Sequence, residues 1–489
     1  MILPSVEAFL NREQKLLIGG RWVAAKSGEI LETINPATGE VLCSVASGDE
    51  ADVNAAVEAA QKAFDDGAAM MPVQRERLLH RFADLMEAHK DELAQLETLD
   101  NGKPYSVASN VEVNVAIGQM RFYAGLPTKL KGETYPVSSP GYHVYTRREP
   151  LGVCAAITPW NYSIVMATQK IGPALASGNT LILKPAEQTP LTAIRLAELA
   201  LEAGIPDGVF NLITGFGSTA GAALTHHPQI AKVAFTGSTE VGQAIMRAAS
   251  GSLKRISLEL GGKSPLIIFD DADIEAASEA AVWAIFANSG QNCVAGSRLF
   301  VQAGIYDEVI NYIARRAGEL KVGSGMQADT EIGPLISQTQ LDQVMGFIKA
   351  GSAAADLVAG GSRVGGPLAN GYFLQPTVFS HVDDSSSIAS EEIFGPVLAA
   401  FRFEDEAEVI QRANATRFGL AAGVYTNRLD RAHRIAAKLR AGVVWINTYD
   451  WFDPAVPFGG SGMSGMGREL GTQVIDMYTE LKSVWVKIE

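Results

Sequence analysis

Cysteine and histidine are both scarce in this chain. Its 489 residues include only Cys43, Cys154 and Cys293, an odd number of widely spaced cysteines, and seven histidines. The cysteine count excludes a disulfide framework and fits a reducing compartment. The histidines do not pair with cysteines or acidic residues at metal-ligand spacings, so we expect no metal site.

The sequence also lacks long hydrophobic runs and an excess of positive charge. No apolar run reaches the roughly 18 residues that a membrane span needs, so we expect no membrane segment. The first residues, MILPSVEAFLNREQKLLIGG, have no basic region followed by an apolar stretch and a cleavage site, which favours a mature cytoplasmic start. A net charge of -14 argues against nucleic-acid binding.

What the chain does contain is typical of a large globular protein, with 47% hydrophobic and 19% charged residues. Two helical apolar patterns precede residue 150. One runs from Val53 to Phe64, and a second runs from Leu78 to Leu96 and is ended by Asn101-Gly102.

From about residue 152, short apolar runs alternate with helical stretches. The runs are GVCAAITP, TLILKPA, VFNLITG, KVAFTGS and RISLELGG. This alternation predicts a parallel sheet with helices on both faces, and such sheets bind ligands beyond the carboxyl ends of their strands.

A second α/β region starts at PLIIFDD and runs to GVVWINTY and a glycine-rich segment. YHVYTRREP and the final SVWVKIE alternate apolar and polar residues, so we expect a small β element that serves subunit contact. The predicted fold is α/β. We expect a Rossmann-like cofactor domain (1–127 and 148–261), a catalytic domain (262–462) and an oligomerisation element (128–147 and 472–489).

Cys293 lies in FANSGQNCVAGSR, among small and polar residues. A reactive cysteine needs surroundings that favour or tolerate a thiolate, and a helix leading to Ser289-Gly290 would bring backbone amides close to the sulfur. A buried structural cysteine is the alternative.

Several polar residues follow the predicted strands. Asn161 in TPWNYS could donate a hydrogen bond to an oxyanion, and Glu259 in SLELGGKS could act as a general base. Lys184 and Glu187 could reach ribose hydroxyls, and Gly237 opens a helix whose N-terminus favours phosphate. Taken singly, each also fits a structural role, such as a turn asparagine or a salt-bridged glutamate. Their order along successive strands of one sheet favours a catalytic site.

Together, PWN, KPAE, FTGSTEVG, ELGGKS, GQNC, EEIFGP and PFGGSGMSGMGRELG resemble the aldehyde dehydrogenase superfamily over nearly the whole chain. The resemblance implies NAD-dependent oxidation of an aldehyde to its carboxylic acid. Cys293 would be the nucleophile, Asn161 and the Cys293 backbone N–H the oxyanion site, and Glu259 the base that hydrolyses the thioester. Lys170 and Glu469 match residues sometimes assigned to a proton path.

The resemblance also implies a cofactor site. Glu187 favours NAD over NADP, because its carboxylate would bind the 2′-hydroxyl and repel a 2′-phosphate. The matching positions are Ile157, Thr158, Pro159, Trp160, Lys184, Glu187, Gly217, Gly237, Ser238, Glu392 and Phe394.

The expected substrate is a small aldehyde. Relatives that act on succinic semialdehyde often carry an arginine in the helix after PWN, where this chain has Gln169, so a carboxylated substrate is disfavoured. The expected pocket residues are Tyr162, Met166, Phe286, Trp451 and Phe452. They suit an aromatic aldehyde such as phenylacetaldehyde, with betaine aldehyde or a medium-chain aldehyde as the alternative. The family forms homodimers or homotetramers.

Two other classes of protein fit less well. A non-catalytic, crystallin-like relative has no chemical need to keep Asn161, Glu259 and Cys293 together. An alcohol-type dehydrogenase would need a Tyr-Lys pair or a zinc site, and the sequence contains neither pattern.

Overall fold

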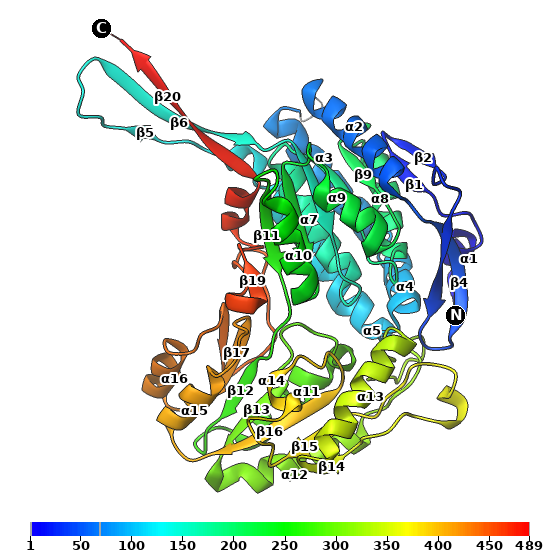
Figure 1. Cartoon of the computed structure of the whole chain (residues 1–489), viewed down its shortest axis with the longest axis vertical. Helices are drawn as coiled ribbons and strands as arrows, with labels where there is room; N and C mark the ends of the chain where they lie inside the picture. Colours follow the sequence, from blue (N-terminus) through cyan, green and yellow to red (C-terminus); the bar gives the residue numbers. More distant parts are fainter. Residues whose placement is uncertain (1, 68–69, 489) are drawn as a thin grey trace.

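The computed structural model describes residues 2–67 and 70–488 and has the predicted α/β architecture (Figure 1). Its first sheet has the strand order β19-β11-β10-β7-β8-β9-β1-β2. The neighbouring strands from β11 through β10, β7 and β8 to β9 run parallel. The strands are β1 (Leu16–Ile18), β2 (Arg21–Val23), β7 (Val153–Ile157), β8 (Thr180–Lys184), β9 (Phe210–Leu212), β10 (Lys232–Thr236), β11 (Arg255–Glu259) and β19 (Gly465–Met466).

Helices cover both faces of this sheet because successive side chains of its buried strands point to opposite sides. Cys154 and Ala156 of β7 enter one core, whereas Val153 and Ala155 enter the other. The first core packs α3 (Pro72–Ala88), α4 (Lys90–Asn101), α6 (Val113–Ala124), α7 (Ser163–Ala176) and α8 (Leu191–Ala203). The second packs α2 (Glu50–Asp65), α9 (Ala222–His226) and α10 (Thr239–Ala249).

The second sheet has the order β14-β15-β16-β13-β12-β17-β18 and is parallel except for β14. Its strands are β12 (Pro265–Ile268), β13 (Arg298–Gln302), β14 (Asp356–Ala359), β15 (Thr377–Ser380), β16 (Val397–Phe403), β17 (Ala421–Tyr425) and β18 (Val443–Ile446). One face packs α11 (Ile274–Phe286) and α12 (Tyr306–Glu319). The other packs α13 (Gln338–Ser352), α14 (Ser387–Ser390), α15 (Glu406–Ala413) and α16 (Leu429–Ala436).

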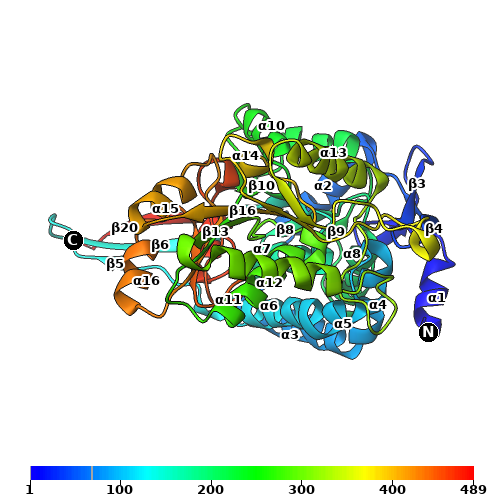
Figure 2. The same cartoon turned by 90° about the horizontal axis from the view of Figure 1, so that it is seen from below.

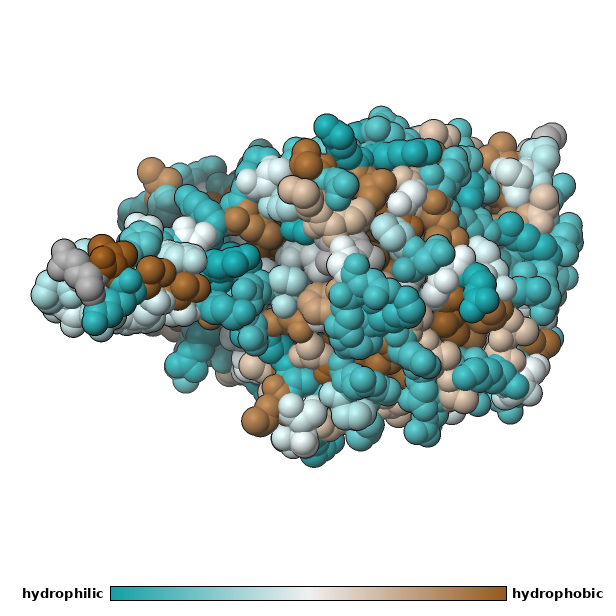
Figure 3. Space-filling view, turned by 90° about the horizontal axis from the view of Figure 1, so that it is seen from above, coloured by the Kyte–Doolittle hydropathy of each residue, from teal (hydrophilic) through white to brown (hydrophobic). Residues whose placement is uncertain are grey.

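A three-stranded arm projects from the body, as Figures 1 and 2 show. It pairs β20 (Thr479–Lys487) with β6 (Tyr142–Pro150), and β6 with β5 (Thr134–Tyr135). Both strands that the alternating sequence predicted are therefore present and lie side by side. Hydrophobic residues are exposed along the arm, among them Leu481, Trp485 and Ile488 (Figure 3).

The N-terminal part departs from the prediction at one point. The apolar pattern from Leu78 to Leu96 belongs to two helices, α3 and α4, and not to a single one. His89 between them has φ -105° and ψ 22°, outside the helical range, and its ring bonds to Glu92. Both helices bury an apolar face in the same core, so the pattern continues across the break. Gly102, at φ 94°, ends α4 as predicted.

The order of the first sheet places a crevice at its centre. From β7 the chain goes to β8 and β9 on one side, and later strands β10 and β11 lie on the other. This reversal leaves the loops after β7 and β10 facing one another at the carboxyl edge.

Among residues 2–67 and 70–488, no helix has the length and apolarity needed to cross a bilayer.

Candidate active site

A cavity of about 400 Å³ opens at this carboxyl edge, between the two large sheets. Loops after β7, β10 and β11 line it on one side, and the turn before β13 lines it on the other. It gathers most of the residues predicted from sequence: Pro159, Trp160, Asn161, Tyr162, Met166, Gly237, Ser238, Glu259, Cys293, Glu392 and Phe394.

Cys293 sits on a strained turn that follows α11. Asn288 and Ser289 have φ angles of 50° and 57°, which non-glycine residues rarely adopt. Gly290 follows at φ 70°, and a Cβ there would lie 2.0 Å from the Gly395 carbonyl oxygen. The turn therefore requires glycine at 290, and it holds the part-exposed Cys293 at the cavity wall.

The electrostatics at Cys293 favour a protonated thiol. Burial raises its pKa, and the nearby carboxyls of Glu259, Glu392 and Asp450 raise it further. The thiolate is the nucleophile, so the group needs a proton acceptor or a positive charge close by before it can react.

Asn161 is fixed opposite the cysteine turn. Its side-chain Nδ2 donates to the Gln291 carbonyl oxygen at 3.0 Å, which leaves its second N–H free to meet a ligand oxygen. Its backbone carbonyl accepts hydrogen bonds from Asn288 Nδ2 at 3.0 Å and from Lys103 Nζ at 2.9 Å. The amide is thus rigidly placed between the two large sheets.

Glu259 ends β11 and presents a carboxyl group to the cavity. It is 3% exposed, and its Oε1 has no hydrogen-bond partner in the described part of the chain. Burial raises its pKa well above the ordinary value, and nearby Glu469 raises it further, whereas Lys170 lowers it. A buried carboxyl with a raised pKa and a free oxygen is suited to accepting a proton from water.

Behind Glu259 lies a buried polar chain. Lys170 Nζ donates to Glu469 Oε1 at 2.8 Å and to Thr236 Oγ1 at 2.7 Å. Gln169 Nε2 donates to the other carboxylate oxygen of Glu469. The structure thus brings Lys170 and Glu469 together, and it turns Gln169 toward them.

Several of the residues proposed to bind the cofactor line the same cavity as Cys293. Trp160 packs edge-on against Phe394, with ring centroids 5.2 Å apart. Burial raises the pKa of Glu392 to about 7, and its Oε1 accepts a hydrogen bond from Gly262 N at 3.0 Å. Ser238 caps α10, whose first turn opens into the cavity and favours an anion there.

The remaining residues proposed to bind the cofactor do not line the cavity with Cys293, except Pro159. Glu187 pairs with the buried Lys184 at 3.3 Å and lines a neighbouring cavity of about 550 Å³ together with Phe216. Gly217 begins a helical turn next to Phe216. Ile157 and Thr158 are buried at the end of β7. We propose that these residues bind an extended dinucleotide, with the Glu187 carboxylate near a ribose.

The five predicted pocket residues divide into two groups. Tyr162 and Met166 line the cavity beside Cys293. Phe286 does not: it ends α11 with its side chain fully buried in the core. Trp451 is 74% exposed and Phe452 41% exposed, and neither is part of the cavity wall.

Sequence reasoning missed three residues that shape the cysteine turn. The Gln291 side chain accepts a hydrogen bond from Ile336 N at 2.9 Å and donates to the Asn288 carbonyl. Asn292 Nδ2 donates to Asp450 Oδ2 at 2.9 Å. Arg298 is buried and donates to three backbone carbonyls on two segments. Their local sequence gives no signal of most of these partners, because Ile336, Asp450 and the carbonyls bound by Arg298 are distant in the chain.

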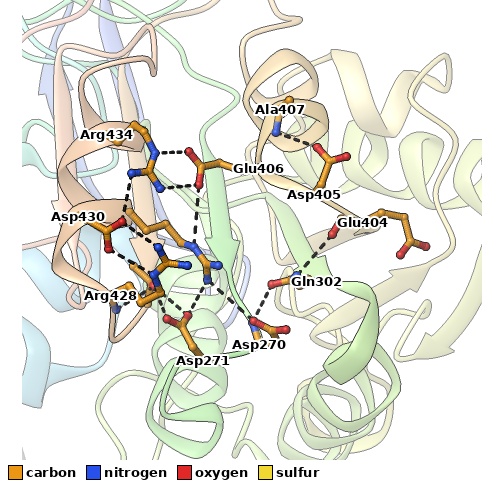
Figure 4. Close-up of polar contacts among 12 residues, drawn as sticks. Asp270, Asp271, Gln302, Glu404, Asp405, Glu406, Ala407, Arg428, Asp430 and Arg434 are labelled. Carbon is orange, nitrogen blue, oxygen red and sulfur yellow. Dashed lines mark hydrogen bonds and ion pairs between the residues drawn. The ribbon is translucent and has the colours of Figure 1, made fainter.

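The carboxyl edge of the second sheet carries a cluster of ion pairs, as Figure 4 shows. Arg431 bonds to Asp271 at 2.9 Å and stacks over the Phe269 ring, while Arg434 binds both oxygens of Glu406. These contacts occupy the edge at which a parallel sheet usually receives a ligand. The cavity with Cys293 lies at the carboxyl edge of the first sheet and at the opposite, amino edge of the second.

Comparison with known proteins agrees with this geometry. The model of the aldehyde dehydrogenase family matches residues 22–484. DhaS of Bacillus subtilis (strain 168), a protein assigned to the aldehyde dehydrogenases, is 52% identical over 491 residues, covering 100% of this chain and 98% of its own. The mitochondrial benzaldehyde dehydrogenase of Antirrhinum majus is 48% identical and covers 96% of this chain and 88% of its own.

A solved structure is similar over the same length. The NAD⁺ complex of an aldehyde dehydrogenase from Bacillus cereus superposes with a TM-score of 0.98 at 49% identity, covering 100% of this chain and 99% of that one.

Proposed function

The chain belongs to the aldehyde dehydrogenase family and oxidises aldehydes with NAD, and we propose that its substrate is an aromatic aldehyde such as phenylacetaldehyde. The observation that carries this proposal is the cavity wall next to Cys293, where Tyr162 and Met166 offer an aromatic and a flexible apolar surface.

We assign the chemistry of the reaction to three residues. Cys293 Sγ attacks the aldehyde carbon and forms a thiohemiacetal, and its thiol proton passes to solvent water as the carbonyl oxygen becomes the oxyanion. The free N–H of Asn161 and the backbone N–H of Cys293 bind the oxyanion. Such donors are each worth about 3 kcal/mol of barrier. NAD, when bound, supplies the hydride acceptor.

The second half of the reaction is hydrolysis of the Cys293 thioester. Glu259 takes a proton from the attacking water, whose oxygen adds to the acyl carbon and releases the thiol. The free, buried Oε1 of Glu259 supports this assignment. Lys170 and Glu469 supply the buried polar route along which that proton leaves.

Carboxylated aldehydes lack a partner in this cavity. Gln169 is engaged with Glu469, and the cationic side chain in the wall, Arg417, pairs with Glu391 at 2.8 Å. A substrate carboxylate would therefore meet no free positive charge in the described wall and would lie near Glu259.

Betaine aldehyde is the second candidate, and one observation favours it. Asp450 is held by Asn292, directly before Cys293, and burial raises its pKa to about 6. At neutral pH this carboxylate is mostly ionised, so it could attract a quaternary ammonium next to the neighbouring aromatic residues.

A substrate panel separates these candidates. We expect kcat/KM with phenylacetaldehyde to exceed that with betaine aldehyde and succinic semialdehyde by at least about tenfold, because a matched apolar group is worth 1–3 kcal/mol in such a pocket. Benzaldehyde and hexanal complete the panel. A preference for betaine aldehyde that Asp450→Asn removes would establish the second candidate instead.

Cofactor preference depends on Glu187 in this account. The variant Glu187→Ser should raise kcat/KM for NADP and lower it for NAD, each by about tenfold, because it removes a ribose partner and a repulsive charge together. The matched control is Glu202→Ser, the same change at an exposed position of α8. Unchanged selectivity in Glu187→Ser would contradict the assignment.

We further propose that the enzyme works in the cytoplasm as a homodimer or homotetramer. Three free cysteines, one of them reactive, are best kept in a reducing compartment. The exposed Leu481, Trp485 and Ile488 support a subunit contact through the arm.

A further inference from the structure

A buried lysine lies directly beneath the proposed oxyanion site. Lys103 follows the Gly102 cap of α4, and its side chain is fully buried. Its Nζ donates to Glu97 at 3.2 Å, to Glu112 at 2.6 Å, and to the backbone carbonyl of Asn161 at 2.9 Å. One charged group thus joins two acidic side chains to the loop that carries the catalytic amide.

The two carboxylates are themselves held in place. Glu97 accepts hydrogen bonds from Ser163 N, in the first turn of α7, at 3.2 Å and from Thr192 Oγ1 at 3.0 Å. Glu112 ends a π-helical turn, Ala108–Glu112, that widens the helix before α6. Such turns re-aim side chains and are frequent at functional sites. Here the turn directs Glu112 to Lys103.

The contact with Asn161 leaves that residue little freedom. A carbonyl oxygen has two lone pairs, and at Asn161 Lys103 takes one and Asn288 the other. The Asn161 side chain is fixed separately through Gln291. Removing Lys103 would release one of the three hydrogen bonds that orient the amide.

Lys103 also touches the proposed substrate wall. Its Nζ lies 4.8 Å from the ring centroid of Tyr162, within the range of a cation–π contact. The same ammonium group therefore holds both the amide and the aromatic ring that flank Cys293.

We propose that Lys103, held by Glu97 and Glu112, is a positioning residue for the first half-reaction and acts by setting the Asn161 amide. This inference rests on the role proposed for Asn161. In this proposal, loss of the Lys103 cluster slows the first half-reaction. A cluster with a purely structural role would affect the stability of the fold alone.

The test uses double variants that remove one positive and one negative charge together, so the net charge of the cluster does not change. Lys103→Met is combined with Glu112→Leu, because an apolar pair of similar volume is tolerated in place of a buried ion pair. Glu97 keeps its hydrogen bonds from Ser163 N and Thr192 Oγ1. A second pair, Lys103→Gln with Glu112→Gln, keeps polar partners but shortens the reach to Asn161. Thermal unfolding of each variant records its stability separately.

The readout is the single-turnover rate of NADH formation, with enzyme in excess over phenylacetaldehyde. This rate precedes hydrolysis and so reports the step that Asn161 assists. We expect both double variants to lose about 10- to 100-fold while NAD binding is unchanged, because a small misplacement of an oxyanion donor has that cost. The matched control is Lys254→Met, another buried lysine that donates to a backbone carbonyl, that of His227.

A double-mutant cycle identifies the route. In an Asn161→Ala background, adding Lys103→Met with Glu112→Leu should change the rate by less than about twofold, because the lysine acts through the residue already removed. An unchanged rate in both double variants, or losses that multiply in the combined variant, would overturn the inference alone. No loss in Asn161→Ala itself would overturn the oxyanion assignment and this inference with it.

Discussion

Cys293→Ala should abolish aldehyde oxidation and leave NAD binding nearly intact. Alanine cannot form the thiohemiacetal, so no thioester can follow, and a loss on the order of 10⁴-fold or more is expected for removal of a nucleophile. The Cys293 side chain lines the cavity but is not among the residues proposed to bind the dinucleotide. NADH formation and NAD binding by fluorescence titration measure the two effects separately.

The other two cysteines provide matched controls. Cys43 and Cys154 are buried and do not line the cavity that holds Asn161 and Glu259, and burial raises the pKa of Cys43 to about 11 and that of Cys154 to about 12. Cys43→Ala and Cys154→Ala should keep turnover within about twofold once folded, since surface and small core changes cost little. Retained turnover in Cys293→Ala would contradict the mechanism.

Glu259→Gln has the second largest expected effect. The variant should form one equivalent of NADH rapidly and then turn over slowly, by about 10²- to 10⁴-fold, because glutamine cannot take the proton from the hydrolytic water. Glutamine has nearly the same volume, so the cavity is preserved. Stopped-flow NADH formation resolves the burst from the steady rate.

The same residue predicts a pH dependence. Glu259 acts as a base only when deprotonated, and burial raises its pKa well above the ordinary value. The wild-type steady rate should therefore rise with pH through this raised pKa, and the rise should vanish in Glu259→Gln. The control is Glu202→Gln, at an exposed position of α8. Normal steady turnover in Glu259→Gln would remove Glu259 from the role of base.

The first sheet could be predicted because its strands are short apolar runs that end in glycine, proline or polar residues. Asn161, Gly237 and Glu259 follow three such runs, and the parallel order brings them to one edge. The rule that parallel sheets bind ligands beyond the carboxyl ends of their strands therefore predicted the position of these three residues.

The other half could not be derived from such a rule. Cys293 precedes a strand of the second sheet, at its amino edge, and only the packing of the two sheets brings it to Glu259. The ion pair of Arg431 with Asp271 at the other edge of that sheet is equally a product of packing. Resemblance to a known family supplied what periodicity could not.

Local sequence also failed where a side chain's partners are distant. Lys103 follows a helix end in a polar segment, yet it contacts Asn161, 58 positions along the chain. Phe286 shares the apolar character of a pocket residue, but the last turn of α11 directs it into the core. The direction of a side chain and its partners far along the chain depend on the assembled fold, so the hydrophobic periodicity of the sequence does not reveal them.

The central claim is that Cys293 carries the acyl group between oxidation and hydrolysis. Glu259→Gln mixed with NAD and phenylacetaldehyde, quenched in acid and digested, should yield one phenylacetyl thioester on the peptide that contains Cys293, and hydroxylamine should remove it. NADH formed without an acyl group on that peptide, or with the acyl group on another residue, would contradict the account.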